Sequence, residues 1–176
     1  MKTTLKKELA KNSIILLVVP NKDYNKIILR EVKKLKGKNI CYVTTNKGHS
    51  ALVNDFEKNK IDTKKFFFID CVTSTILKPK ITPPNCALVS SPRALTELSL
   101  AINKFVDIHF PLIFIDSLST LLVYHSPKVL TNFVHSLSTK VRETGHVVLV
   151  MTIADKDKKT ELYKKLQVLA DKVIKV

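Results

Sequence analysis

Apolar and polar positions alternate in blocks along the chain. Short continuous apolar runs, typical of strands buried on both faces, occur at residues 14–19, 39–45 ("NICYVTT"), 65–69 ("KFFFI"), 111–115 ("PLIFI") and 146–152. Shorter runs at 87–90 and 172–176 predict two further strands. The sequence therefore predicts a central sheet whose strands are covered on both sides.

Segments with a helical period separate these runs. In residues 23–35, Ile28, Val32 and Leu35 fall on one face, and Lys33 and Lys34 lie on the others. Further helices are predicted at 5–11 and 49–58, after Ser91-Pro92, after Ser126-Pro127 and at 158–170. Gly37 and Gly145 are expected to end the helices that precede them.

One segment has neither the apolar run of a strand nor the period of a helix. Residues 71–85, "CVTSTILKPKITPPN", hold three prolines and are expected to form a loop or an irregular edge. Residues 1–12 predict a short helix or an arm, and residues 13–176 a single domain.

The order of the elements defines the fold class. Strands that alternate with helices predict a three-layer α/β domain with a mostly parallel central sheet and helices on both faces. Ligands of such sheets bind beyond the carboxyl ends of the strands. The segments to weigh are therefore 20–24, 45–48, Asp70, 116–119 and 152–155.

The stretch "PLIFIDSLSTLL" is an apolar strand that ends at Asp116 and continues with Ser117. It resembles the Walker B strand of RecA-superfamily ATPases, and most of all the KaiC/RadA branch. "NICYVTT" and the closing "LADKVIKV" resemble two other strands of that family, in the same order, so the resemblance covers roughly residues 13–176. It implies a RecA-like, P-loop NTPase-type fold in which the Asp116 carboxylate would act through Mg²⁺.

The family's phosphate loop has no counterpart. A P-loop requires G-x-x-x-x-G-K-[ST], but Val19 and Tyr24 stand at the glycine positions, Asn25 at the lysine and Lys26 at the hydroxyl residue. Shifting the match by one residue puts Lys26 on the lysine but Pro20 on a glycine, and proline lacks the backbone donor.

The catalytic glutamates that the resemblance implies after the second strand are also missing. Asn46 and Lys47 stand there, and neither can orient an attacking water as a carboxylate does. We therefore expect no enzymatic activity, no catalytic residue and no cofactor.

A residual nucleotide site remains an alternative. It would use Lys22, Asn25, Lys26, Asp116 and Ser117, with Asp116 as a metal ligand only if a magnesium nucleotide binds. Without a nucleotide, Asp116 is expected to cap the turn that follows its strand.

The chain carries 30 Lys+Arg against 15 Asp+Glu, a formal +15. This balance suits a polyanion, and a nucleic-acid-binding RadA-like paralogue is the second hypothesis. Only three of the basic residues are arginines, which argues against a dedicated sequence reader. The lysines that gather near the end of the second helix and before the third strand are the polyanion candidates or, alternatively, a solubilising surface: Lys33, Lys34, Lys36, Lys38, Lys64 and Lys65.

Cys41, Cys71 and Cys86 have no metal-ligand spacing and are expected to be buried free thiols in a reducing compartment. The charged start is followed by only about six apolar residues, too few for a signal peptide, so a cytoplasmic location is expected. The first hypothesis is a non-catalytic ATPase-fold protein that regulates or binds a protein partner, or a second copy, through its nucleotide edge.

Overall fold

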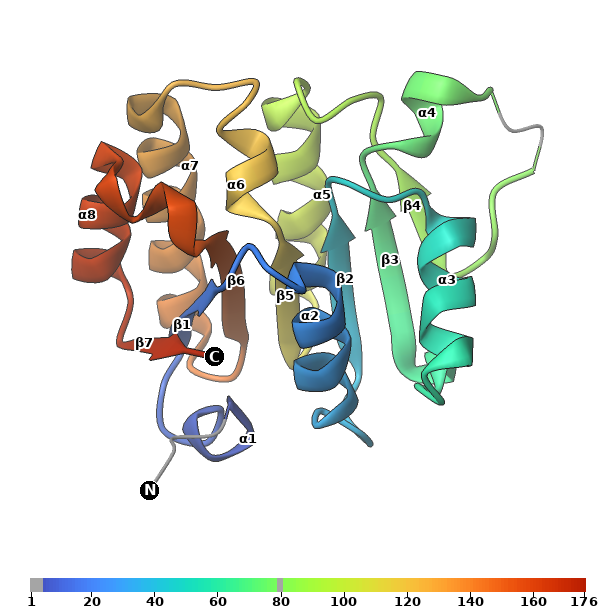
Figure 1. The fold of residues 1–176 in the computed structure, drawn as a ribbon, viewed down its shortest axis with the longest axis horizontal. Helices are drawn as coiled ribbons and strands as arrows, with labels where there is room; N and C mark the ends of the chain where they lie inside the picture. The colour runs from blue at the N-terminus through green and yellow to red at the C-terminus, as the bar shows by residue number, and fades with distance from the viewer. Residues whose placement is uncertain (1–4, 79–80) are drawn as a thin grey trace.

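A seven-stranded parallel sheet forms the centre of the computed structural model, which describes residues 5–78 and 81–176 (Figure 1). The strand order is β4-β3-β2-β5-β6-β1-β7. The strands are β1 Ile14–Val19, β2 Ile40–Thr44, β3 Phe66–Asp70, β4 Cys86–Leu88, β5 Leu112–Asp116, β6 Val148–Ala154 and β7 Lys172–Lys175.

Helices cover both faces of this sheet, which confirms the predicted α/β class. The α-helices are α1 Leu5–Glu8, α2 Tyr24–Lys33, α3 His49–Lys58, α4 Thr73–Ile76, α5 Leu95–Asp107, α6 Leu118–Leu121, α7 Pro127–Thr144 and α8 Glu161–Leu169. Two 3₁₀ turns, η1 Thr63–Lys65 and η2 Asp155–Lys159, complete the elements.

Alternate residues of each strand enter two separate cores. Ile113 and Ile115 of β5 pack with α5, α6, α7 and α8 on one face. Phe114 of the same strand packs on the opposite face with Tyr42 and with residues of α1, α2 and α3. Asp116 lies two residues beyond Phe114, so its side chain emerges on the face that α2 and α3 cover.

The expected capping signals had mixed outcomes. Ser126 caps α7, its hydroxyl accepting from the Val129 N–H at 3.3 Å, and Gly145 ends that helix in the left-handed region, as predicted. The cap predicted at Ser91-Pro92 is wrong, because α5 begins only at Leu95 and these residues form a turn before it. Gly37 has a φ of 90° but lies beyond the cap of α2, in the turn that leads to β2.

Two short helices were not predicted. Residues 71–85 were expected to be without a helix, yet they contain the single turn α4, which Asp70 initiates by accepting from the N–H groups of Val72 and Thr73. Ser117 caps α6 in the same manner, its hydroxyl accepting from the Thr120 N–H. In both cases a strand-end side chain, and not a helical period, starts the turn.

Cys41, Cys71 and Cys86 are buried free thiols, as expected. Among the described residues, no helix is both long enough and apolar enough to cross a bilayer.

Candidate functional site at the carboxyl edge of the sheet

Asp116, the last residue of β5, lies at the carboxyl edge of the sheet between β2 and β6. The parallel register sets Asp116 beside Thr44 of β2, and β6 separates β5 from β1. Only 4% of its surface is exposed, so its carboxylate depends on protein donors for solvation.

Two tyrosines donate hydrogen bonds to this carboxylate. The Tyr24 hydroxyl, from the first residue of α2, lies 3.0 Å from Asp116 Oδ1. The Tyr42 hydroxyl, from β2, lies 2.6 Å from Oδ2. The Tyr42 ring stacks on Phe114 with a centroid distance of 5.2 Å, which directs its hydroxyl toward Asp116.

Thr152 of β6 joins the same cluster. Its hydroxyl lies 2.8 Å from the Tyr24 hydroxyl and 3.5 Å from Asp116 Oδ1. Because β6 lies between β1 and β5, Thr152 lies between the strand that leads to Tyr24 and the strand that carries Asp116. Asp116, Tyr24, Tyr42 and Thr152 are hereafter the Asp116 cluster.

The cluster shifts the titration of its members. Burial raises the pKa of Asp116, and the hydrogen bonds from Tyr42 and Tyr24 and the charge of Lys47 oppose this rise only in part. Burial, together with the negative charge of Asp116, raises the pKa of Tyr24 and of Tyr42. Both hydroxyls therefore keep their protons and remain hydrogen-bond donors at neutral pH.

The loop of residues 20–23 joins β1 to α2 at the place where a phosphate loop would lie. Its Asn21 N–H donates to the carboxylate of Asp155, 3.1 Å away. Asp23 precedes α2 with a φ of 61° and without a side-chain cap. A carboxylate of the chain itself thus binds a backbone donor in this loop, and Asp23 adds a second negative charge there.

Little space remains beside Asp116. The cavity that it lines with Asn25, Tyr42, Lys47 and Asp55 measures about 10 Å³. A single water needs roughly 10–15 Å³, and pockets for small ligands run to several hundred. The carboxylate is therefore enclosed almost entirely by the chain's own side chains.

The five residues of the predicted nucleotide site are only partly brought together. Asn25 and Asp116 line the same small cavity. Lys22 and Lys26 are exposed, and Lys26 lines a different hollow, with Arg30 and Asn59. Ser117 is buried and occupied as the cap of α6.

Asn46 and Lys47, which were expected to stand where the family has its glutamates, lie in the loop after β2. Asn46 is exposed. The Lys47 ammonium pairs with Asp55 of α3 at 2.6 Å. This ion pair holds the Lys47 side chain against α3, the helix that begins two residues later at His49.

A second strand-end carboxylate has a structural role. Asp70, fully buried at the end of β3, accepts from the N–H groups of His49, Val72 and Thr73. A Cβ on Gly48 would come within 2.7 Å of the Thr73 hydroxyl, so a glycine is needed where these two loops meet.

The polyanion candidates gather at the opposite, amino edge of the sheet. Lys33, Lys36, Lys38 and Lys65 line one pocket there. Lys34 instead pairs with the buried Glu31 at 2.6 Å, and Lys64 is exposed outside that pocket's lining.

The sequence analysis did not identify three partners of Asp116. Tyr24 was weighed only as a misfit at a glycine position, Tyr42 only as part of a strand, and Thr152 only as a residue at a strand end. The signal that would have found Tyr42 and Thr152 is geometric: β2 and β6 are the neighbours of β5, so polar residues on these two strands can reach Asp116.

The sheet order and the two helical layers define a RecA-like α/β protein. A crystal structure of the KaiC-like protein PH0186 from the hyperthermophilic archaeon Pyrococcus horikoshii OT3 matches with a TM-score of 0.66 and 16% sequence identity. The match covers 93% of this chain and 71% of that chain. The predicted RecA/KaiC-like fold is thereby confirmed.

Residues 36–176 match the model of a family described as "Family of unknown function (DUF7504)", and the chain belongs to this family. The comparison with curated proteins gave no match.

Proposed function

We propose that this protein is a non-catalytic member of the RecA-like ATPase fold that acts as a regulatory or interaction module through its carboxyl edge. The observation that carries the proposal is the 3.0 Å hydrogen bond from the Tyr24 hydroxyl to Asp116. This hydrogen bond occupies a carboxylate that would otherwise be available to a metal ion. Its donor comes from the first residue of α2, the helix whose N-terminus would face the phosphates of a bound nucleotide.

The surroundings of this hydrogen bond support the same conclusion. Phosphoryl transfer requires cations placed around the γ-phosphate and a group that orients the nucleophile. Lys47 is paired with Asp55, and the Asn21 N–H is bound to Asp155. A Mg²⁺-nucleotide does not fit beside Asp116, because burial favours its protonated form and the adjoining cavity holds at most about one water.

Exposed apolar side chains at the same edge support the interaction role. Ile76 and Leu77, at the end of α4, are 74% and 63% exposed, and Val123, just after α6, is 76% exposed. A hollow of about 470 Å³ connects the two segments, since Thr75 and Tyr124 both line it. Arg93, which also lines this hollow, lies over the Tyr124 ring at 5.1 Å from its centroid. Exposed apolar side chains that gather at one edge are typical of protein–protein contact sites.

Hydrolysis assays test the catalytic half of the proposal. With Mg²⁺-ATP, phosphate release by the wild-type chain is expected to equal the protein-free blank, and Asp116→Asn is expected to leave it unchanged. Release above the blank that Asp116→Asn abolishes would contradict the proposal, because it would make Asp116 a working metal ligand.

A further inference from the structure

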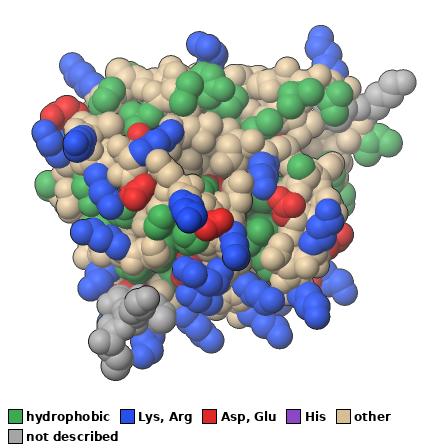
Figure 2. Space-filling view, viewed as in Figure 1, with side chains coloured by type: hydrophobic (Ala, Val, Ile, Leu, Met, Phe, Trp, Pro, Cys, Tyr) green, Lys and Arg blue, Asp and Glu red, His purple; other side chains and the backbone are tan. Residues whose placement is uncertain are grey.

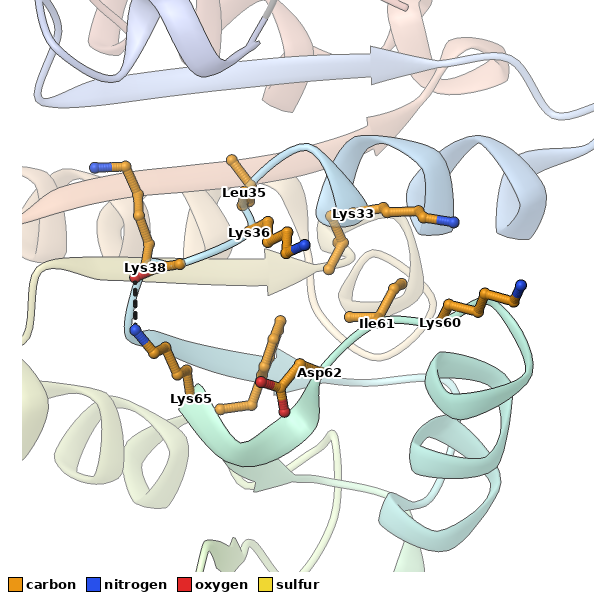
Figure 3. A pocket seen from close by; sticks show the side chains of 11 residues that line it. Lys33, Leu35, Lys36, Lys38, Lys60, Ile61, Asp62 and Lys65 are labelled. Carbon is orange, nitrogen blue, oxygen red and sulfur yellow. Dashed lines mark hydrogen bonds between the residues drawn. The ribbon is translucent and has the colours of Figure 1, made fainter.

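A pocket of about 510 Å³ opens at the amino edge of the sheet, opposite the Asp116 cluster (Figure 3). Two segments wall it: the end of α2 with the turn that follows, and the segment between α3 and β3. Its floor is apolar and almost fully buried, formed by Val32, Leu35, Ile61 and Phe66. We call it the lysine pocket, after the residues that rim it: Lys33, Lys36, Lys38, Lys60 and Lys65.

The charge at this rim is one-sided. The five lysines and Asp62 give a formal +4. The side chain of Asp62 is partly occupied, because it accepts from the Lys64 N–H at 3.0 Å. Within residues 5–78 and 81–176, Lys33, Lys36, Lys38 and Lys60 take part in none of the ion pairs. Their mutual repulsion is therefore not relieved by the protein.

The walls are held in place. The Lys65 ammonium donates to the Gly37 carbonyl at 3.1 Å and ties the two segments together. Lys33 and Lys60 extend to the same side of the pocket from opposite walls, Lys36 lies beside Leu35, and Lys38 extends away (Figure 3). The pocket is therefore formed without a bound ligand, and the ammonium groups of Lys33, Lys36 and Lys60 lie around its opening.

One of these lysines occupies an unfavourable backbone conformation. Lys60 follows α3 with a φ of 56°, where its N–H bonds the Glu57 carbonyl and the Ile61 N–H bonds the Phe56 carbonyl. This pattern is the Schellman motif, whose left-handed position usually holds glycine. A lysine there costs about 1 kcal/mol, and such outliers concentrate at functional sites.

The basic surface continues beyond the pocket. A neighbouring hollow of about 480 Å³ shares Lys33 and adds Lys26 and Arg30 along α2. Figure 2 shows Lys and Arg side chains gathered along the lower part of the face that contains α2, with few acidic groups among them. A negatively charged ligand would therefore meet cations on its approach to the pocket.

We propose that the lysine pocket binds a compact anion that carries several phosphate groups, such as an inorganic oligophosphate or a phosphorylated metabolite. Lysine ammoniums act as point charges and suit phosphates without fixing one geometry. A single-stranded nucleic acid fits less well, because such strands bind on exposed aromatic rings, and the one ring that lines the pocket, Phe66, is 7% exposed and part of the core.

The proposal is independent of the Asp116 cluster, which lies at the other edge of the sheet. Its test is calorimetric titration with inorganic tripolyphosphate, without metal. The triple variant Lys33→Gln, Lys36→Gln, Lys60→Gln is expected to weaken binding roughly 10- to 100-fold, from the loss of three surface charge contacts. A matched triple variant, Lys104→Gln, Lys128→Gln, Lys165→Gln, removes the same charge from exposed positions on α5, α7 and α8. It is expected to keep the wild-type affinity within about twofold.

Lys60 gives a sharper test, because stability and binding should change in opposite directions. Lys60→Gly relieves the left-handed backbone and is expected to raise the unfolding midpoint by about 1–3 °C while weakening tripolyphosphate binding. Lys60→Asn tolerates the same conformation and removes the same charge, so it should weaken binding equally. Unchanged binding in both variants would contradict a role for Lys60 in the pocket.

Three further results would overturn the proposal. The first is no measurable binding of tripolyphosphate to the wild type. The second is an equal loss of tripolyphosphate affinity in both triple variants, which would show that the net charge of the protein, and not the pocket, attracts the anion. The third is tighter binding of a single-stranded oligonucleotide than of tripolyphosphate, lost in the pocket triple variant, which would assign this surface to nucleic acid.

Discussion

Tyr24 and Asp116, 92 residues apart in the sequence, are joined by a hydrogen bond of 3.0 Å from the tyrosine hydroxyl to the carboxylate. It ties the first residue of α2 to the last residue of β5 at the edge where RecA-like sheets have their ligand side. Asn25, the residue that stands at the lysine position of a P-loop, directly follows this tyrosine. The contact therefore links the β1–α2 junction and the strand-end aspartate of β5 in one structural unit.

Tyr24→Phe is expected to lower the free energy of unfolding by about 1–3 kcal/mol, because a buried acceptor loses its donor. Urea unfolding at neutral pH measures this loss. Tyr163→Phe, which removes the same atom from a largely buried tyrosine of α8 outside the Asp116 cluster, should change the stability by less than about 0.5 kcal/mol. Equal effects of the two substitutions would show that the Tyr24–Asp116 hydrogen bond has no special weight.

Asp116 should make the stability depend on pH with a defined sign. Burial raises its pKa above the ordinary value of 3.8, so the folded chain binds this proton more tightly than the unfolded chain does. Its contribution to stability is complete at acid pH and is lost as the pH rises through the raised pKa. Asp116→Asn cannot titrate, so the stability of the wild type minus that of D116N should fall as the pH rises from about 4, the ordinary pKa of an aspartate, to neutrality. Urea unfolding across this range measures the difference, and a constant difference would contradict the raised pKa.

The cysteine thiols should be protected in the folded protein. Burial raises the pKa of Cys71 and of Cys86 to about 12 and raises that of Cys41 as well. At about pH 8 a pKa near 12 leaves roughly one thiolate in ten thousand. An aromatic disulfide reagent should therefore react at least about 100-fold more slowly with the native chain than with the unfolded chain. Rapid reaction of one native thiol would show that the segment around it opens readily.

The carboxyl edge should carry the association that we propose. The double variant Leu77→Glu, Val123→Glu places charges in its exposed apolar patch and is expected to weaken association measured by sedimentation over a range of concentrations. The matched variant Leu100→Glu, Val168→Glu changes residues that are 62% and 83% exposed on α5 and α8, and it should have no effect. A wild-type chain that stays monomeric at about millimolar concentration would exclude a second copy as the partner.

The hydrophobic periodicity of the sequence was sufficient to predict the layers of the fold, because the central strands are apolar on both faces and each long helix has one apolar stripe. It failed at α4, where the carboxylate of Asp70 starts a helical turn without any apolar period. It failed at Ser91-Pro92 because that signal is shared by turns and helix starts. For the candidate site, Asp116 was found from its place after an apolar strand. Tyr24, Tyr42 and Thr152 were not identified as its partners, because their contacts depend on strand order, which a single sequence does not contain.

The lysine clusters illustrate the same limit. Two groups separated in the sequence, near Lys36 and near Lys64, were predicted as polyanion candidates, but the sequence did not indicate that they share a pocket. The parallel pairing of β2 with β3 places the segments before these strands at the same edge and brings Lys36 and Lys65 to one pocket. Lys34, in the middle of the first group, points instead to Glu31.

A thermal melt with and without millimolar Mg²⁺-ATP tests the central claim most directly. A nucleotide present at a hundred times its Kd would add about 2.7 kcal/mol to the stability and raise the midpoint by several degrees. We expect no shift that depends on Asp116, because Tyr24 and Tyr42 occupy its carboxylate and the loop of residues 20–23 offers no phosphate cradle. Because the lysine pocket could bind ATP as a polyphosphate, the melt is repeated with the pocket triple variant. A rise that persists in that variant and disappears in Asp116→Asn would contradict the proposal and make the protein a nucleotide binder.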